Sequence, residues 1–259
     1  MEETQLQPFL DFALEAAWEA GRVTLGYFQT NLLVELKADA SPVTEADRRA
    51  EQVVRELVNR FWPDHGVIGE EFGQERPDAE FVWVVDPIDG TKSFITGVPL
   101  FGTLLALLHN REPVVGVLYF PALNELIYAA RHSGCFWNGR RARVSGVREL
   151  AQAKLMTSGL NSFAPQGKAE AWERLVGATA IQRTWGDAYG YALVATGRAD
   201  IMVDPIMEVW DAAAVQVVVE EAGGTFTDWQ GRPTISSREG IATNGALLEP
   251  VLALVRGEG

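Results

Sequence analysis

The chain has 259 residues, 47% of them hydrophobic and 22% charged, which is enough for one large or two modest globular domains. Its formal net charge of −13, with no block of lysine and arginine to offset it, argues against nucleic acid as a partner. No apolar run approaches the roughly 18 residues of a membrane span, and Met1 to Gln5 lack the basic start of a signal peptide. We therefore expect neither a membrane partner nor a secretory leader. The single cysteine, Cys135, excludes an intrachain disulfide and favours a cytoplasmic location.

Two helices followed by a series of strands are predicted in the first half of the chain. Apolar residues recur at helical spacing from Leu6 to about Gln29, and Pro42-Val43-Thr44-Glu45-Ala46-Asp47 opens a second helix that runs to about Phe61. Short apolar segments typical of strands follow at Gly66 to Gly69, Phe81 to Val85, Thr103 to His109, Pro113 to Phe120 and Glu125 to Ala130. Asn138-Gly139 then predicts a hairpin turn, so this half is α+β and ends near Val144.

The second half alternates between strands and helices. Its predicted strands are Lys154 to Ser158, Ile181 to Arg183, Ala199 to Val203 and Gly224 to Thr227. Its predicted helices are Ala169 to Gly177, Asp187 to Gly197 and Trp210 to Ala222. This alternation is typical of a layered α/β unit. We therefore expect an α/β protein in which an α+β domain, residues 1–145, packs against an α/β domain, residues 146–259.

Two carboxylates follow the strand predicted to end at Val85, in the segment Asp86-Pro87-Ile88-Asp89-Gly90-Thr91. Because two anions in one turn raise each other's pKa, a hard divalent cation between them is the economical arrangement. The Ile88 carbonyl is a further oxygen donor, Gly90 lets a ligand approach the backbone, and Thr91 offers an N–H and a hydroxyl to a phosphate. The alternative is a surface turn, which this composition also favours.

Three other acidic positions have both a functional and a structural interpretation. Glu70 and Glu71 follow a short apolar strand, where side chains can converge on a cleft, but paired glutamates in a loop are usually solvent-exposed. Asp47 lies at a helix start, where it can stabilise the helix N-terminus instead of a ligand. Asp211 begins a strongly apolar helix and is either its cap or a charge directed into a cleft.

Five segments together resemble the signature of the inositol monophosphatase superfamily. They are S-P-V-T-x-A-D at Ser41 to Asp47, G-E-E at Gly69 to Glu71, D-P-I-D-G-T at Asp86 to Thr91, W-D-x-A-A at Trp210 to Ala214 and E-E-A-G-G at Glu220 to Gly224. They occur in the family's order and span nearly the whole chain. The resemblance implies Mg²⁺-dependent, lithium-sensitive hydrolysis of a small-molecule phosphate monoester on a layered αβαβα sugar-phosphatase fold, commonly as a homodimer.

The resemblance also implies a role for each matching residue. Two Mg²⁺ ions per subunit are expected, and the family allows a third, weaker ion near Glu70. The implied ligands are Glu70, Asp86 and the Ile88 carbonyl for one ion, and Asp86, Asp89 and Asp211 for the other. The implied catalytic residues are Glu70 and the pair that orients and deprotonates the attacking water, Asp47 and Thr91, while the N–H groups of Gly90 and Thr91 hold the phosphate. The first domain would then bind metal and phosphate, and the second would recognise the substrate.

The second half decides which phosphate ester is hydrolysed. Gly186-Asp187-Ala188-Tyr189-Gly190-Tyr191, followed by Ala195-Thr196-Gly197-Arg198-Ala199-Asp200, resembles the histidinol-phosphate phosphatase branch, whereas inositol-cleaving members usually carry a small hydroxyl residue in place of Asp187. A carboxylate in the pocket would pair with the cation of histidinol phosphate, and such a charge-assisted hydrogen bond is worth roughly 1.5–3 kcal/mol. The residues assigned to substrate binding are Asp89, Asp187, Asp204 and Asp211.

Local alternatives stay open at these positions. Asp187 also has the position of a helix N-cap after Gly186 and can fill both roles. Asp204 stands seven residues before Asp211, where inositol-cleaving members commonly carry a glutamate that contacts ring hydroxyls, and Glu208 adds a further acid.

The sequence therefore leads to three hypotheses. The first is a histidinol-phosphate phosphatase of histidine biosynthesis, and the second is an inositol-1-monophosphatase or a related sugar-phosphate phosphatase. The third is a non-catalytic relative that acts as a binding or scaffold protein. Every ligand position that the resemblance implies is filled, which counts against the third hypothesis.

Overall fold

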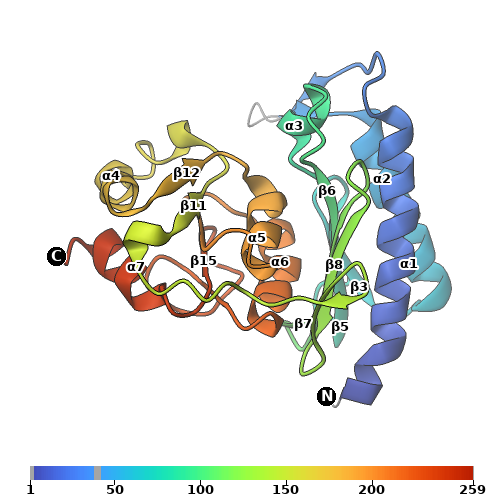
Figure 1. Ribbon diagram of the computed structural model, residues 1–259. Helices are drawn as coiled ribbons and strands as arrows, with labels where there is room; N and C mark the ends of the chain where they lie inside the picture. The colour runs from blue at the N-terminus through green and yellow to red at the C-terminus, as the bar shows by residue number, and fades with distance from the viewer. Residues whose placement is uncertain (1–2, 38–41, 259) are drawn as a thin grey trace.

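Five layers, in the order helix, sheet, helix, sheet, helix, make up the molecule (Figure 1). The structure is a computed structural model that describes residues 3–37 and 42–258. Helices α1 (Glu3–Tyr27) and α2 (Glu45–Phe61) form the first layer, α5 (Asp187–Ala195) and α6 (Val209–Glu221) the middle one, and α4 (Ala169–Ala178) and α7 (Leu248–Arg256) the last. This arrangement confirms the layered αβαβα fold that the family resemblance implies.

The first sheet has eight strands in the order β10-β9-β8-β7-β6-β5-β3-β4. Its strands are β3 (Gly66–Gly69), β4 (Gly73–Glu75), β5 (Phe81–Asp89), β6 (Gly102–His109), β7 (Glu112–Phe120), β8 (Glu125–Ala130), β9 (Gly134–Trp137) and β10 (Arg140–Arg141). All neighbouring pairs are antiparallel except β3 with β5. Asn138-Gly139 joins β9 to β10, as predicted for a hairpin turn.

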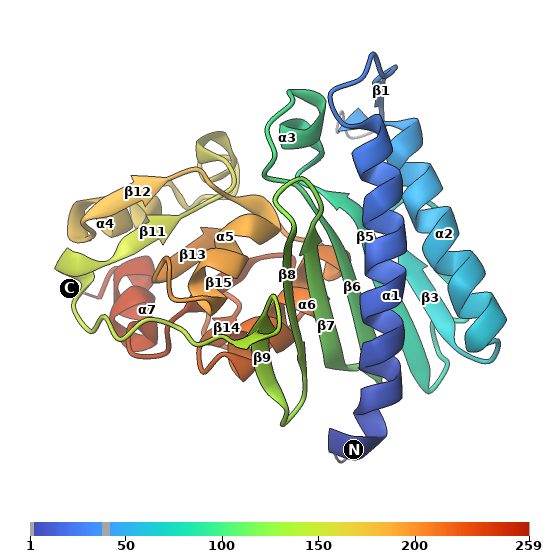
Figure 2. The same ribbon diagram turned by 45° about the vertical axis from the view of Figure 1, so that its right-hand side comes forward.

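The second sheet has five strands in the order β12-β11-β13-β15-β14 (Figure 2). They are β11 (Lys154–Met156), β12 (Ile181–Arg183), β13 (Ile201–Asp204), β14 (Thr225–Thr227) and β15 (Gly240–Thr243). Strand β11 runs parallel to β12 and β13, whereas β15 is antiparallel to both of its neighbours. The remaining elements are the short pair β1 (Glu35–Leu36) and β2 (Pro42–Val43), helix α3 (Thr91–Ile95), and 3-10 turns at Leu150–Gln152 and Leu160–Ser162.

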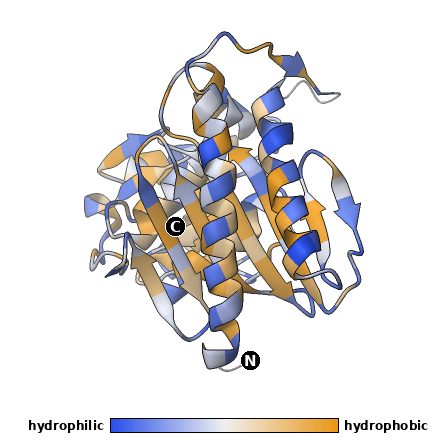
Figure 3. Cartoon of the chain, turned by 90° about the vertical axis from the view of Figure 1, so that its right-hand side faces the viewer, coloured by the Kyte–Doolittle hydropathy of each residue, from blue (hydrophilic) through white to orange (hydrophobic). Residues whose placement is uncertain are grey.

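Apolar side chains fill the space between successive layers. One cluster lies between α1, α2 and the first sheet, a second surrounds α5 and α6, and a third lies between the second sheet and α4 and α7. In the first cluster Trp83 is fully buried and packs against Phe9 and Phe12. Each fully buried large apolar side chain contributes roughly 1.5–3 kcal/mol, so the layers are held mainly by these contacts. Figure 3 shows α1 and α2 from outside, with many hydrophilic residues facing the viewer.

Several elements differ from the sequence-based expectation. Strand β5 continues four residues past the predicted end at Val85, and β4, β9, β15 and α7 fall in segments where no element was predicted. Proline normally interrupts a central strand, yet β5 contains Pro87. Pairing of β5 with β3 ends at Val85, and the register with β6 shifts between Asp86 and Asp89. The missing N–H of Pro87 therefore removes no hydrogen bond between strands. Because of the register shift, both aspartates lie at the end of β5.

In the part of the chain that the structure describes, no helix combines the length and apolarity required to cross a membrane.

Candidate active site

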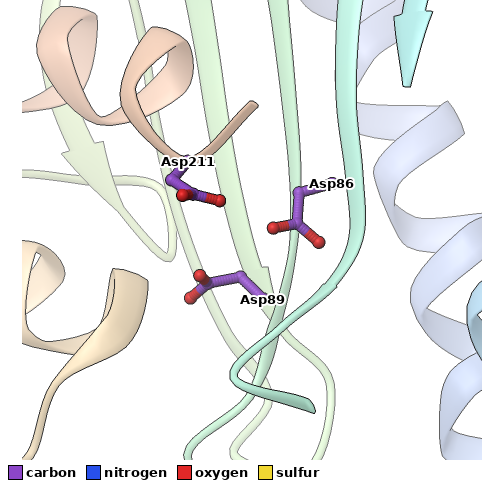
Figure 4. Close-up of side chains that lie close together, drawn as sticks. All are labelled: Asp86, Asp89 and Asp211. Carbon is purple, nitrogen blue, oxygen red and sulfur yellow. The ribbon is translucent and has the colours of Figure 1, made fainter. Parts of the chain in front are cut away.

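Three carboxylates from two segments that are distant in sequence meet at the end of β5. Asp86 and Asp89 belong to β5 and Asp211 to the first turn of α6, and each offers an oxygen within 4.8 Å of the other two (Figure 4). Burial, followed by the charge of neighbouring carboxylates, holds the pKa of Asp86 and of Asp89 well above the usual range of an aspartate. Burial also raises the pKa of Asp211 to about 7. Mutual repulsion in this cluster would be relieved by a cation.

The donor atoms fit a hard divalent ion. Two buried carboxylate oxygens, Asp47 Oδ1 and Asp86 Oδ1, have no hydrogen-bond partner among the described residues. A buried acceptor without a partner is unfavourable, and carboxylate oxygens are the ligands that Mg²⁺ prefers. The cluster of Asp86, Asp89 and Asp211 therefore has the chemistry of a Mg²⁺ site.

Asp211 combines the two roles that the sequence left as alternatives. It is the third residue of α6, and its Oδ2 accepts a 2.7 Å hydrogen bond from the N–H of the N-cap residue Glu208, as in a capping box. Its carboxyl group also offers an oxygen within 4.8 Å of one on Asp86. The same side chain thus stabilises the helix start and takes part in the acidic cluster. Glu208 itself forms an ion pair with Arg238.

Asp47 has the same position in α2. Thr44 is the N-cap, and Asp47 Oδ2 accepts hydrogen bonds from the Thr44 N–H at 2.8 Å and its hydroxyl at 2.6 Å. These contacts fix the carboxyl group and leave Oδ1 free. Burial raises the pKa of Asp47 and the hydrogen bonds from Thr44 oppose that rise. Ser41, the first residue of the motif that contains Asp47, lies outside the described residues.

Glu70 lies near the cluster but outside the group of three. Its charge is among the causes that raise the pKa of Asp86, so the two carboxylates are close. The Glu70 side chain forms an ion pair with Lys37 at 2.7 Å, and Lys37 also pairs with Glu71 at 2.6 Å. Lys37, which directly follows β1, was not identified from the sequence because nothing local connects it to its two partners, which lie 33 and 34 positions later.

The residues after Asp89 form a tight turn into α3. Gly90 is the N-cap of α3 with φ of 80°, and a Cβ there would lie 2.9 Å from the Leu100 carbonyl oxygen. Only glycine adopts this conformation without strain in such a narrow space. The Thr91 hydroxyl donates a 3.0 Å hydrogen bond to the Ile88 carbonyl. This bond fixes the Thr91 side chain beside the backbone that connects the two aspartates.

A cavity of about 490 Å³ opens next to the acidic cluster. Asp89, Asp187, Asp204 and Asp211, the four residues assigned to substrate binding, all line it. It also contains Ser158, which the sequence did not single out, together with Lys92 and Tyr191. The cavity therefore brings the two halves of the chain together at one site.

Asp187 lines the cavity and lies beside Gly90. A Cβ on Gly90 would lie 3.2 Å from Asp187 Oδ2, so the two residues are in contact. Asp187 is not the N-cap of α5, because Gly186 has that position and Asp187 is the first helical residue. Burial raises the pKa of Asp187, whereas the Lys92 ammonium lowers it. The N–H of Ala188 donates a hydrogen bond to Asp89 Oδ2, which joins α5 to the end of β5.

Comparison with known proteins extends these observations over the whole chain. A model described as the inositol monophosphatase family matches residues 5–258. A protein named histidinol-phosphatase from Chlorobaculum parvum is 42% identical over 252 residues, which cover 96% of this chain and 97% of that one. Another protein of that name, from Mycobacterium tuberculosis, is 42% identical over 243 residues, with 92% and 93% covered. A solved structure of an inositol monophosphatase from Zymomonas mobilis superposes with a TM-score of 0.88 at 34% identity, covering 97% of this chain and 98% of that one.

Proposed function

This chain belongs to the inositol monophosphatase family and is a phosphatase, and we propose that it hydrolyses histidinol phosphate to histidinol and phosphate. The observation that carries the proposal is the Asp187 carboxylate, which lines the cavity beside Gly90 at the start of the phosphate-binding turn. Histidinol phosphate carries an ammonium and an imidazole, whereas inositol offers only hydroxyl groups. A carboxylate at this position favours a cationic substrate by roughly 1.5–3 kcal/mol. The two relatives named histidinol-phosphatase support the same assignment.

We propose Mg²⁺ as the cofactor, because the acidic cluster and its buried unpaired oxygen fit this ion. Glu70, Asp86 and the Ile88 carbonyl would hold one ion, and Asp86, Asp89 and Asp211 a second, with Asp86 shared. A third, weaker ion would lie near Glu70. Bound Mg²⁺ supplies positive charge that neutralises the phosphate and the departing alkoxide. The ion pair with Lys37 engages Oε1 of Glu70 and leaves Oε2 available as a metal ligand.

The remaining chemistry comes from side chains and backbone of this chain. Asp47 Oδ1 is buried without a partner, and its raised pKa suits a group that takes a proton from the attacking water. Thr91 would orient that water, and the N–H groups of Gly90 and Thr91 would hold the phosphate at the start of α3. The water oxygen bonds to phosphorus, its proton passes to Asp47, and the ester P–O bond breaks. The departing alkoxide takes a proton from solvent water and leaves as the alcohol.

Initial rates test the substrate assignment. The Asp187→Ala variant is expected to lose about tenfold or more in kcat/KM on histidinol phosphate, because about 1.5–3 kcal/mol of ion pairing is removed. On β-glycerophosphate, which carries no cation, the loss is expected to stay within about twofold. An equal loss on both substrates would contradict the proposal.

A second candidate is hydrolysis of inositol 1-phosphate or a related sugar phosphate. The 34% identity to an inositol monophosphatase over nearly the whole chain supports it. Asp187, in place of a small hydroxyl residue, counts against it. Rates on histidinol phosphate and inositol 1-phosphate in the presence of Mg²⁺ distinguish the two candidate functions. Inhibition by added Li⁺ is expected for either substrate.

We also propose that residues 1–145 bind metal and phosphate and that residues 146–259 recognise the substrate. Asp211 is an exception to this division, since it belongs to the second part and joins the acidic cluster. A homodimer and a role in histidine biosynthesis follow from the family resemblance and remain proposals. The buried, free Cys135 suits the reducing cytoplasm, which we propose as the location.

A further inference from the structure

The backbone of Asp187 has an unfavourable conformation. Its φ of 52° lies in the left-handed region, which residues other than glycine rarely adopt. Such a conformation persists when surrounding contacts determine it, and it is found at functional sites. For Asp187 the main contact is a 2.8 Å hydrogen bond from its own N–H to Ser158 Oγ. Gly186 allows this approach, because a Cβ there would lie 2.1 Å from Ser158 Cα.

Ser158 is in turn oriented by Asp204. The Ser158 hydroxyl donates to Asp204 Oδ2 at 2.9 Å, and the Ser158 N–H donates to Asp204 Oδ1 at 3.0 Å. A serine hydroxyl has one proton, so its donation to Asp204 turns an oxygen lone pair toward the N–H of Asp187. The chain of contacts therefore runs from Asp204 through Ser158 to Asp187.

Asp204 has little capacity left for a substrate. It is buried, and besides Ser158 it accepts hydrogen bonds from the Tyr191 hydroxyl at 3.1 Å and the Thr157 hydroxyl at 3.5 Å. Both of its oxygens are thus engaged by neighbouring groups of the protein. An aspartate is also one methylene shorter than the glutamate that inositol-cleaving relatives are expected to carry there.

We propose that Ser158 and Asp204 are positioning residues that hold the carboxylate of Asp187 toward the substrate, and that neither contacts the substrate itself. This replaces the expectation that Asp204 binds substrate directly. The inference rests on the proposed function, because it assigns selectivity for a cationic phosphate ester to the geometry of Asp187. Removal of the Ser158 hydroxyl then releases the strained backbone and lowers selectivity without altering the hydrolytic residues.

A double-mutant cycle tests the proposal, with kcat and KM measured on histidinol phosphate and on β-glycerophosphate. Ser158→Ala is expected to raise KM for histidinol phosphate about tenfold, the effect of about one hydrogen bond, and to change kcat/KM for β-glycerophosphate by less than about twofold. In an Asp187→Ala background the same substitution is expected to have no further effect on histidinol phosphate.

Ser145→Ala is the matched control. Like Ser158, the Ser145 hydroxyl donates to a buried aspartate, Asp200, and accepts a hydrogen bond, but it lies outside the cavity. This variant is expected to lower Tm and to keep the kinetics on both substrates.

The possible failures are distinguishable. A full additional loss from Ser158→Ala in the Asp187→Ala background overturns the positioning role and leaves the substrate assignment intact. Equal losses on the two substrates in Asp187→Ala alone overturn the substrate assignment, and the inference falls with it. If Ser158→Ala does not fold, Tyr191→Phe removes one of the other donors to Asp204 and is expected to show the same selective rise in KM.

Discussion

Asp86→Asn is expected to stabilise the Mg²⁺-free protein while it removes activity. The carboxylates of Asp86, Asp89 and Asp211 offer oxygens within 4.8 Å of one another. At an effective dielectric constant of about 20, Coulomb's law gives about 3.5 kcal/mol for each ionised pair at this distance. Protons shared within the cluster reduce this repulsion, so we expect a gain of about 1–2 kcal/mol in the free energy of unfolding, or about 2–8 °C in Tm.

With added Mg²⁺ the wild type should melt at a higher temperature than Asp86→Asn, which reverses the order expected without Mg²⁺. An ion present at about one hundred times its Kd stabilises the wild type by about 2.7 kcal/mol, whereas the variant has lost the shared ligand and gains less. Its kcat should fall by at least about 10²-fold. Thermal melting with EDTA and with Mg²⁺ measures both effects, and calorimetry counts the ions. Asp64→Asn, which removes an exposed aspartate, is the control and should change neither.

Two results would refute this reasoning. A Mg²⁺-free Asp86→Asn protein that melts below the wild type would show that repulsion in the cluster is not a significant term. Normal two-ion binding by the variant would show that Asp86 is not the shared ligand.

Two further predictions concern single side chains. Thr91→Ala should lower kcat by about 10²-fold and leave the Mg²⁺-induced rise in Tm unchanged. The control variant Thr96→Ala, in the same segment, should keep full kcat. Loss of Mg²⁺ binding in Thr91→Ala would assign Thr91 to the metal site instead. Burial raises the pKa of Cys135 to about 12. At about pH 8.5 the folded protein should therefore react with iodoacetamide about 10³-fold more slowly than the unfolded chain. Equal reaction rates would contradict this prediction. Because this pKa is raised, the thiol contributes stability below its ordinary pKa of 9.0, and that contribution is lost as pH rises toward 12.

Individual helices and strands were predicted because they carry clear periodicity, whereas the layered αβαβα arrangement was implied by the family resemblance. Strand β15 and helix α7 were missed. Gly240–Thr243 is a short segment, and Asn244, whose Oδ1 accepts a hydrogen bond from the Leu247 N–H, was not recognised as a helix-start signal. Strand β5 was predicted too short, because Pro87 is usually a strand breaker and its tolerance depends on where β3 stops pairing. Where β3 stops pairing with β5 is a property of the tertiary structure, and the local sequence does not indicate it.

The candidate site was predicted in part for the same reason. Asp86, Asp89 and Asp211 belong to recognisable motifs, and the structure brings them together. Lys37 and Ser158 belong to no motif, and their partners lie between 29 and 46 residues away. Their roles depend on hydrogen bonds between distant segments, which neither composition nor spacing indicates.

The alternatives for Asp47 and Asp211, helix cap or active-site acid, could not be separated because capping engages only one carboxylate oxygen and leaves the other role open. In α2 and in α6 the aspartate is the third helical residue, and one of its oxygens accepts the N-cap N–H. A carboxylate has two oxygens, so the cap leaves the second one available and fixes its direction. In Asp47 that second oxygen is buried and unpaired, and Asp211 offers an oxygen within 4.8 Å of one on Asp86. Capping thus restricts the rotamers of two acids that the proposed reaction requires in fixed positions, which reduces the entropy lost when substrate binds.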